Sequence, residues 1–174
     1  MTCDIEISIF GKVSNFVAVF EVAHSAATEG RINYLEEFGP EAFLPMLEAA
    51  ERENRAVVLT RGRTTDFFQD LRDACREAGL SYVVKYGESG SEGFRAGFSW
   101  KPGQRGEHAF LMNGGKTVLT VDSVRSAASV GLDAVADLVE NTARRAETGR
   151  IEIERGFAES YREYSGYRPE APAR

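Results

Sequence analysis

Residues 61–65 are the segment whose side chains could most readily hold an anionic ligand. They read Arg61-Gly62-Arg63-Thr64-Thr65, between an apolar run at 56–60 and a segment of helical periodicity. Guanidinium groups and the backbone N–H groups of a helix N-terminus donate hydrogen bonds to phosphate and carboxylate oxygens, and α/β proteins often bind anions at such loops. The segment matches neither a Walker A loop nor Gly-x-Gly-x-x-Gly. A capped helix with solvated arginines is the alternative to a candidate anion site at Arg61, Arg63, Thr64 and Thr65.

The two histidines, His24 and His108, are the only imidazoles available for acid–base chemistry. Two histidines can act as a general acid and a general base, but no pattern brings these two together, and ordinary polar strand ends account for both. The chain also shows no metal-ligand spacing, no nucleophile elbow and no His-Glu-x-x-His. The sequence therefore predicts no catalytic residue, no metal site and no cofactor, and it favours a protein that is not an enzyme.

Charged residues are unevenly distributed. The net charge is −6. Residues 21–53 hold eight acids and two arginines, so this segment accounts for the whole excess of acidic residues. Residues 95–125, in contrast, hold more basic than acidic residues. An acidic surface favours basic protein partners and repels nucleic acid, although solvated glutamates on a surface helix give the same count. We take Glu36, Glu37 and Glu41 as candidate interface residues, and direct nucleic-acid binding is disfavoured.

Aromatic and basic residues are interleaved at two further places. Near the C-terminus the tyrosines Tyr161, Tyr164 and Tyr167 stand among arginines, and both residue types are favoured anchors of protein interfaces. Docking of this segment on its own domain is the alternative. In the run 94–101, aromatic and basic residues fall on opposite faces of one strand, which favours core packing over stacking on nucleic-acid bases.

The first part of the chain shows two strand patterns before a helix. Residues 4–10 alternate between apolar and polar, and the apolar run 16–22 predicts a second strand, paired with the first in a hairpin about Gly11. The small polar residues of 24–33 predict a loop. In the helix that follows, Pro45 predicts a kink or a restart, because proline removes a helical hydrogen bond.

Residues 56–86 carry the most regular pattern. The strand 56–60 leads through the 61–65 loop into a helix over 66–78, with Asp66 and Gln69 as a capping box and Gly79 as its end. The apolar stripe of this helix comprises Phe67, Phe68, Leu71 and Cys75. A strand over 81–86 completes a βαβ unit, whose two strands should be parallel.

The second half of the chain changes from strands to helices. Strands are predicted over 94–101, 107–113 and 116–121, the last two as a hairpin about Asn113-Gly114-Gly115. A helical segment follows that is capped by Asp122 or Ser123, is interrupted at Gly131, and continues to about 146 with the apolar stripe Leu132, Val135, Ala136 and Val139. A last helix is expected after Gly149, with one side formed by Ile153, Phe157, Tyr161 and Tyr164.

These elements predict an α+β fold (mixed α/β). We expect a mixed, mainly antiparallel sheet with one βαβ unit, helices packed against it, and a helical C-terminal third. With 174 residues and 43% hydrophobic content, the chain should form a single domain over 1–164 with a disordered tail over 165–174. Short apolar runs and an acidic N-terminus predict a cytoplasmic protein without a membrane span, and Cys75 is expected to be a buried thiol.

Two hypotheses about function remain. Charge segregation and the missing catalytic signature favour a non-catalytic protein–protein interaction module, such as a small acidic inhibitor, immunity-type or regulatory protein that acts on a basic partner surface. The alternative is a small enzyme or ligand-binding domain for an anionic phosphate or carboxylate substrate at 61–65. No motif identifies a family, and the sequence leaves homo-oligomerisation open.

Overall fold

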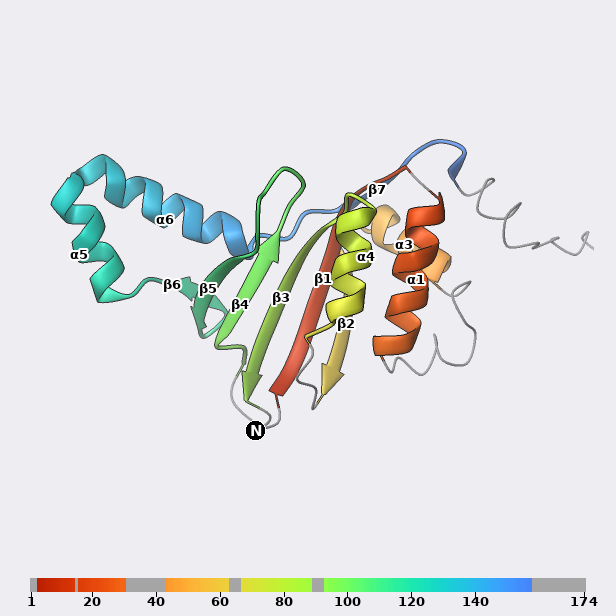
Figure 1. The fold of residues 1–174 in the computed structure, drawn as a ribbon, viewed down its shortest axis with the longest axis horizontal. Helices are drawn as coiled ribbons and strands as arrows, with labels where there is room; N and C mark the ends of the chain where they lie inside the picture. The colour runs from red at the N-terminus through yellow and green to blue at the C-terminus, as the bar shows by residue number, and fades with distance from the viewer. Residues whose placement is uncertain (1–2, 15, 31–42, 63–66, 89–92, 158–174) are drawn as a thin grey trace, which may run out of the picture.

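A mixed sheet is the centre of the fold, and helices lie on both of its faces (Figure 1). The structure, a computed structural model, describes residues 3–14, 16–30, 43–62, 67–88 and 93–157. None of the helices in these ranges is long and apolar enough to cross a bilayer. In chain order the elements are β1 (Cys3–Val13), α1 (Phe16–Gly30), α3 (Phe43–Arg52), β2 (Val57–Gly62), α4 (Gln69–Glu77), β3 (Ser81–Glu88), β4 (Ala96–Trp100), β5 (His108–Asn113), β6 (Lys116–Val118), α5 (Val121–Val130), α6 (Leu132–Ala146) and β7 (Ile151–Ile153).

The sheet is organised around β1. The strand order is β2-β1-β3-β4-β5-β6, and each neighbouring pair is antiparallel. β7 pairs in parallel with the end of β1, with Gly11 opposite Ile151. Because β2 and β3 both run antiparallel to β1, they are parallel to each other. The predicted βαβ unit is therefore present as β2-α4-β3, with β1 between its strands, and the predicted mixed, mainly antiparallel sheet is confirmed.

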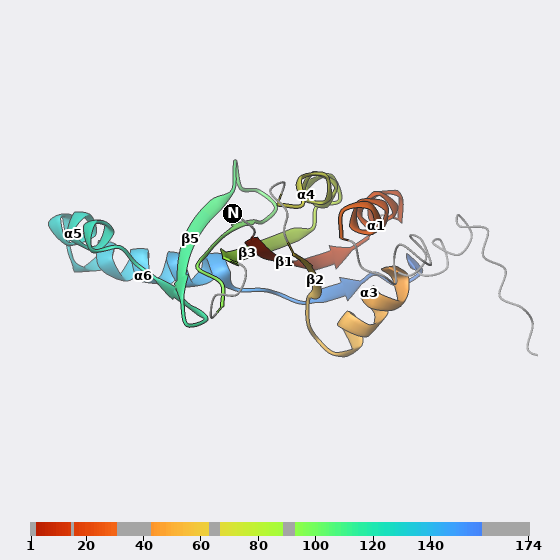
Figure 2. The same cartoon turned by 90° about the horizontal axis from the view of Figure 1, so that it is seen from below.

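The core lies between the sheet and the helices that cover it. Helices α1 and α4 pack together on one face, and α3 lies on the other face beside β7 (Figure 2). The alternating residues of β1, Ile5, Ile7 and Ile9, are at most 1% exposed, as their pattern predicts. Cys75 on α4 is a buried free thiol, which confirms that prediction.

Residues 16–22 are helical, which corrects the predicted hairpin. β1 continues past Gly11 to Val13, and α1 then occupies both the predicted second strand and residues 24–30 of the predicted loop. A short apolar run fits either a strand or a buried helix, so the residues beyond it decide. Here the buried positions follow helical spacing: Val19, Val22, Ala23 and Ala26.

A helix restart near Pro45 stays a prediction, because residues 31–42 lie outside the described residues. The predicted kink is absent, because Pro45 does not interrupt α3. It is the third residue of α3, which continues to Arg52. The N–H groups of the first helical turn have no partner inside the helix, and a proline there removes no hydrogen bond. Leu47 and Ala50 are buried on α3, as the pattern predicts.

Helix α4 begins later than its sequence pattern predicts. Its first residue is Gln69, because Phe67 and Phe68 have left-handed backbone angles, with φ of 53° and 58°. Phe68 is fully buried, and the ring of Phe67 lies edge-on to Tyr86 with the centroids 5.0 Å apart. Packing of these rings thus sets the start of the helix. The N-cap is Phe68, which makes no side-chain cap hydrogen bond, so the predicted capping box of Asp66 and Gln69 is wrong. Asp66 itself lies outside the described residues.

Two predicted chain reversals at glycines are confirmed. α4 ends at Glu77 with Ala78 as its C-cap, and Gly79 follows with φ of 70°. The β5–β6 hairpin turns at Gly114 and Gly115, which have φ of 56° and 77°, with Asn113 paired to Lys116. Positive φ at both central residues is the geometry of a type I′ turn.

The helical segment after β6 is confirmed, with its predicted interruption at Gly131. The predicted cap is wrong. Thr120 is the N-cap of α5, and its Oγ1 accepts a hydrogen bond from the Ser123 N–H at 3.1 Å. β6 consequently ends at Val118, before the predicted 121.

Residues 151–153 form a strand, which corrects the start of the helix predicted after Gly149. The part of that helix from 158 onward stays a prediction. The sequence Ile-Glu-Ile alternates, and its first residue, Ile151, is 1% exposed beside β1. Pairing with a free stretch of β1 therefore outweighs the weak helical pattern. Phe157 is buried as well, and the residues from 158 onward lie outside the described part of the chain.

Candidate functional site

Most of the predicted site residues lie outside the described residues. Arg61 and Gly62 lie in β2, with Arg61 opposite Ile5 of β1, so the strand extends two residues into the predicted 61–65 loop. The other predicted residues of the anion site and the interface are not described: Arg63, Thr64, Thr65, Glu36, Glu37, Glu41, Tyr161, Tyr164 and Tyr167. Their roles stay predictions.

The structure places the two histidines far apart in the sheet order. His24 is on α1, which contacts β2 and α4, whereas His108 begins β5, and β1, β3 and β4 separate β2 from β5 (Figure 1). They do not form an acid–base pair. In the described ranges, no group of three His, Cys, Asp or Glu side chains is arranged to hold a metal ion.

A partly buried ionic network joins the loop before β5 to α4. The Glu107 carboxylate accepts hydrogen bonds from Arg72 and from the Tyr82 hydroxyl, the latter at 2.6 Å, and Arg76 lies 2.8 Å from it. The Arg72 guanidinium also lies 4.9 Å from the ring centroid of Phe98. Burial and the hydrogen bond to Glu107 raise the pKa of Tyr82. Asp73 lies 2.9 Å from Arg76 as well, so two carboxylates balance the two guanidiniums, and the network is structural in character.

Helices α5 and α6 form a hairpin that projects from the edge of the sheet, and we call it the arm (residues 121–146; Figure 1). No residue of α5 is buried, and Thr142 is the buried residue of α6. On the arm, the large apolar residues that face solvent are Val121 (64%), Val124 (36%), Val130 (81%), Leu132 (88%) and Val139 (51%). The apolar stripe predicted along α6 therefore exists, but much of it is exposed.

The base of the arm is attached to the sheet by polar contacts. The Lys101 ammonium donates to the Arg144 carbonyl at 3.2 Å, and Arg145 donates to the Ala109 carbonyl at 3.3 Å. α6 contacts β4, β5 and β6, and Thr142 is 5% exposed. The arm is thus held at one end, while the turn between α5 and α6 lies away from the sheet (Figure 1).

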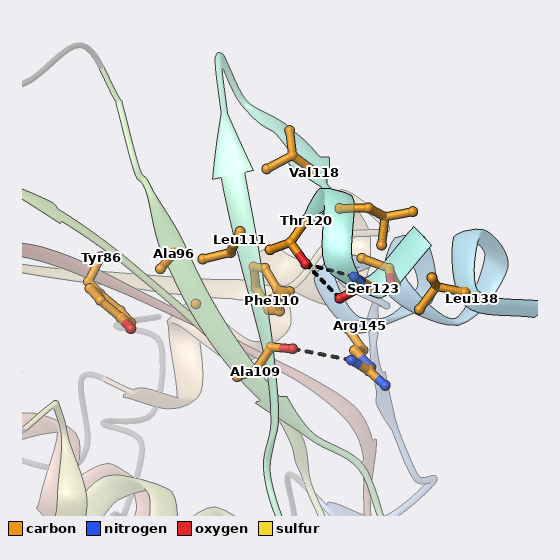
Figure 3. Close-up of a pocket in the computed structure, with 13 residues that line it drawn as sticks. Tyr86, Ala96, Ala109, Phe110, Leu111, Val118, Thr120, Ser123, Leu138 and Arg145 are labelled. Carbon is orange, nitrogen blue, oxygen red and sulfur yellow. Dashed lines mark hydrogen bonds between the residues drawn. The ribbon is translucent and has the colours of Figure 1, made fainter. Parts of the chain in front are cut away.

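An apolar cavity of about 260 Å³ lies between the arm and the strands β4, β5 and β6 (Figure 3). Phe110, Leu111 and Leu138 contribute apolar walls. On the arm side, the hydroxyls of Thr120 and Ser123 lie 2.7 Å apart. Apolar walls with a few convergent polar groups are typical of small-molecule sites.

A second cavity, of about 420 Å³, lies beside the base of the arm and is basic. Its lining includes Lys101, His108, Arg144 and Arg145 and contains no carboxylate. Arg145 also lines the apolar cavity, so one guanidinium borders both. The sequence indicates only a mild positive excess over 95–125, because it does not reveal that α6 adds two arginines to that surface.

No protein-family model matches this chain, and neither a curated protein nor a solved structure matches it. The arm and the two cavities at its base are the features of the described chain from which we argue function.

Proposed function

We propose that this chain is a non-catalytic protein–protein interaction module whose binding surface is the arm. The proposal rests on the exposure of the arm. α5 has no buried residue, and Val130 and Leu132, on either side of the turn, are 81% and 88% exposed. Single exposed apolar residues are ordinary on protein surfaces, whereas several on one projecting element indicate an interaction site.

The length of α5 supports the same proposal. α5 has ten residues, and isolated helices shorter than about 12–15 residues are marginal in water, because most helical stability comes from packing. A partner that covers the valines of α5 would supply roughly 25 cal/mol per Å² of buried apolar surface. Such a partner would stabilise the arm as well as bind it.

The polar residues of the arm favour a partner with basic groups. The arm holds four carboxylates, all within residues 121–140, and three arginines, of which Arg144 and Arg145 lie at its base. The acids therefore dominate away from the base, and the side chain of Asp122 is 95% exposed. An apolar surface bordered by lysines or arginines would complement both features. This agrees with the basic partner expected from the acidic segment 21–53, so an inhibitor or regulatory role remains our proposal.

Replacing Val130 and Leu132 together with serine should abolish capture of protein partners by the tagged chain. Because both side chains are exposed, the free energy of unfolding should change by less than about 0.5 kcal/mol. Affinity capture from host lysate at low and high salt, with identification of the bound proteins, measures the first effect. Urea denaturation measures the second.

Val58→Ser is the matched control, because Val58 is 42% exposed on β2, away from the arm. This variant should capture the same proteins as the wild type. If the Val130/Leu132 variant also captures them unchanged, the arm is not the binding surface.

Binding of a small amphiphilic anion is a second candidate function, favoured by the position of Arg145 between the two cavities. The apolar cavity would hold the hydrocarbon part of the ligand, and the basic cavity its carboxylate or phosphate. Arg145 and Lys101 each donate to one carbonyl. A guanidinium has five N–H donors and an ammonium three, so donors remain for a ligand.

Aromatic carboxylates or phosphate monoesters should stabilise the wild type if this second function holds. At a ligand concentration of 100 Kd the expected gain is about 2.7 kcal/mol, measured as a rise in Tm. Arg145→Met should lose the gain, whereas Arg125→Met, at a side chain 79% exposed on α5, should keep it. A panel of such compounds that leaves the wild-type Tm unchanged would exclude the site.

A further inference from the structure

We infer that the partner which covers the arm is a second copy of this chain, bound antiparallel through α6. The inference rests on the proposed function, since it names the occupant of the same surface. Each copy would contribute α5 and α6, and the two arms would form a four-helix bundle related by a two-fold axis.

The first argument is an apolar stripe on α6 that its own chain does not cover. Val135, Leu138 and Thr142 are partly or fully buried against the rest of the chain. A different set of residues is exposed and follows the spacing of four, three and four: Leu132, Ala136, Val139 and Ala143. This is the spacing of a coiled-coil seam, which packs against another helix.

The second argument is the size of the side chains along this stripe. Alanines flank Val139 on both sides, at 136 and 143. In an antiparallel pair centred on Val139, Ala136 of one copy lies near Ala143 of the second copy. Small residues at facing positions let two helices approach closely, while Val139 fills the space at the axis.

The third argument is charge, which selects the orientation. Asp133 and Asp137 lie in the first half of α6, and Arg144 lies in its last turn. In a parallel pair in register, Asp133 and Arg144 lie about 16 Å apart along the helix axis, so they cannot pair. In the antiparallel pair Asp133 meets Arg144 of the second copy, because they lie six residues before and five residues after Val139. Arg144 also pairs with Glu140 of its own helix, so its guanidinium would bridge two carboxylates. Opposite charges at the border of a seam favour this arrangement.

These charges also suit the dipole of α6 itself, which prefers acids near the start of a helix and bases near its end. That preference alone does not require an exposed apolar stripe beside them. The same surface of α6 carries both the acids and the arginine that would pair with them. An interface in which two copies use the same surface requires this. A second copy is therefore the occupant that the arm fits without further assumptions about another protein.

Sedimentation equilibrium of the full chain, over about 1 to 100 µM, tests the inference. The wild type should have the mass of two chains. Val139→Asp should weaken the dimer at least tenfold, because it brings two carboxylates together at the axis. Asp133→Arg and Arg144→Asp should each weaken it about tenfold, and the double variant should regain most of the affinity.

Glu77→Arg, at an exposed position of α4 away from the arm, makes the same charge change as Asp133→Arg and should leave the dimer intact. Circular dichroism checks that each variant is folded. A wild type that is monomeric throughout, a dimer that survives Val139→Asp, or a double variant without recovery would each overturn the inference. The capture experiment with Val130 and Leu132 tests the proposed function separately, because it reports binding to any protein.

Discussion

Replacing Gly97 with alanine should destabilise the fold by about 3 kcal/mol. Gly97 lies in the middle of β4, paired with Lys85 of β3 and Phe110 of β5. An added Cβ would meet the backbone oxygen of Val84, and two ring carbons of Phe110 would lie 2.5 and 2.7 Å away. Because the Val84 oxygen belongs to the neighbouring strand, the sheet itself would have to shift. Urea denaturation of the wild type and the variant measures the loss.

Gly106→Ala is the control for this prediction. Nothing lies within 4 Å of a Cβ built at Gly106, so the same chemical change should alter the free energy of unfolding by less than about 0.5 kcal/mol. If the two alanine variants prove equally stable, β4 does not pack at Gly97 as closely against its neighbouring strands as the structure indicates.

Glu107→Leu should cost about 3 kcal/mol of stability. The substitution would leave the guanidinium of Arg72 and the hydroxyl of Tyr82 without their shared carboxylate. Removing one partner of a buried ion pair commonly costs about 3–5 kcal/mol, because the other charge stays buried and unpaired. We expect the lower end, since the side chain of Arg72 is 9% exposed but that of Glu107 is 25% exposed.

Glu154→Leu tests whether burial of the ion pair causes the loss of stability that we expect for Glu107→Leu. Glu154 also forms an ion pair, with Lys12, but the two side chains are 40% and 67% exposed. Surface pairs of this kind contribute about 0–1 kcal/mol. Chemical denaturation should therefore separate the two leucine variants clearly, and an equal loss in both would contradict a structural role for the Glu107 network.

Elements whose structure depends on near neighbours in the chain are predictable from the sequence. The alternation of β1, the turn at Gly114 and Gly115, and the helix end at Gly79 are all confirmed. In each case the deciding interaction spans only a few residues, such as the conformational freedom of glycine at a positive φ. The residues that form such a local pattern are also the residues whose interactions decide the structure.

Elements that depend on distant contacts are not predictable in the same way. The run 16–22 has the composition of a strand, but the edge of β1 that it would occupy is taken by β2 and β3. The start of α4 is decided by packing of Phe67 and Phe68. Glu107 and Arg72 are 35 residues apart, so nothing in the local sequence of either residue indicates the other.

The candidate site is also only partly predictable, because its local pattern is visible in the sequence but its exposure depends on distant contacts. The stripe of Leu132 and Val139 is visible as helical periodicity, but periodicity reports only that one side of a helix is apolar. Whether that side faces its own core or solvent depends on where the hairpin leaves the sheet. The exposure of the arm is therefore a finding of the structure.

The pairing of β1 also has a consequence for biosynthesis. β1 is made before its partners, which are β2, β3 and, for residues 11–13, β7, about 140 residues further along the chain. On the ribosome, the far end of β1 therefore stays without its partner until residues 151–153 have emerged. Such non-local pairing slows folding and leaves strand edges open meanwhile. Nascent chains that stall before β7 would present this edge to neighbouring polypeptides.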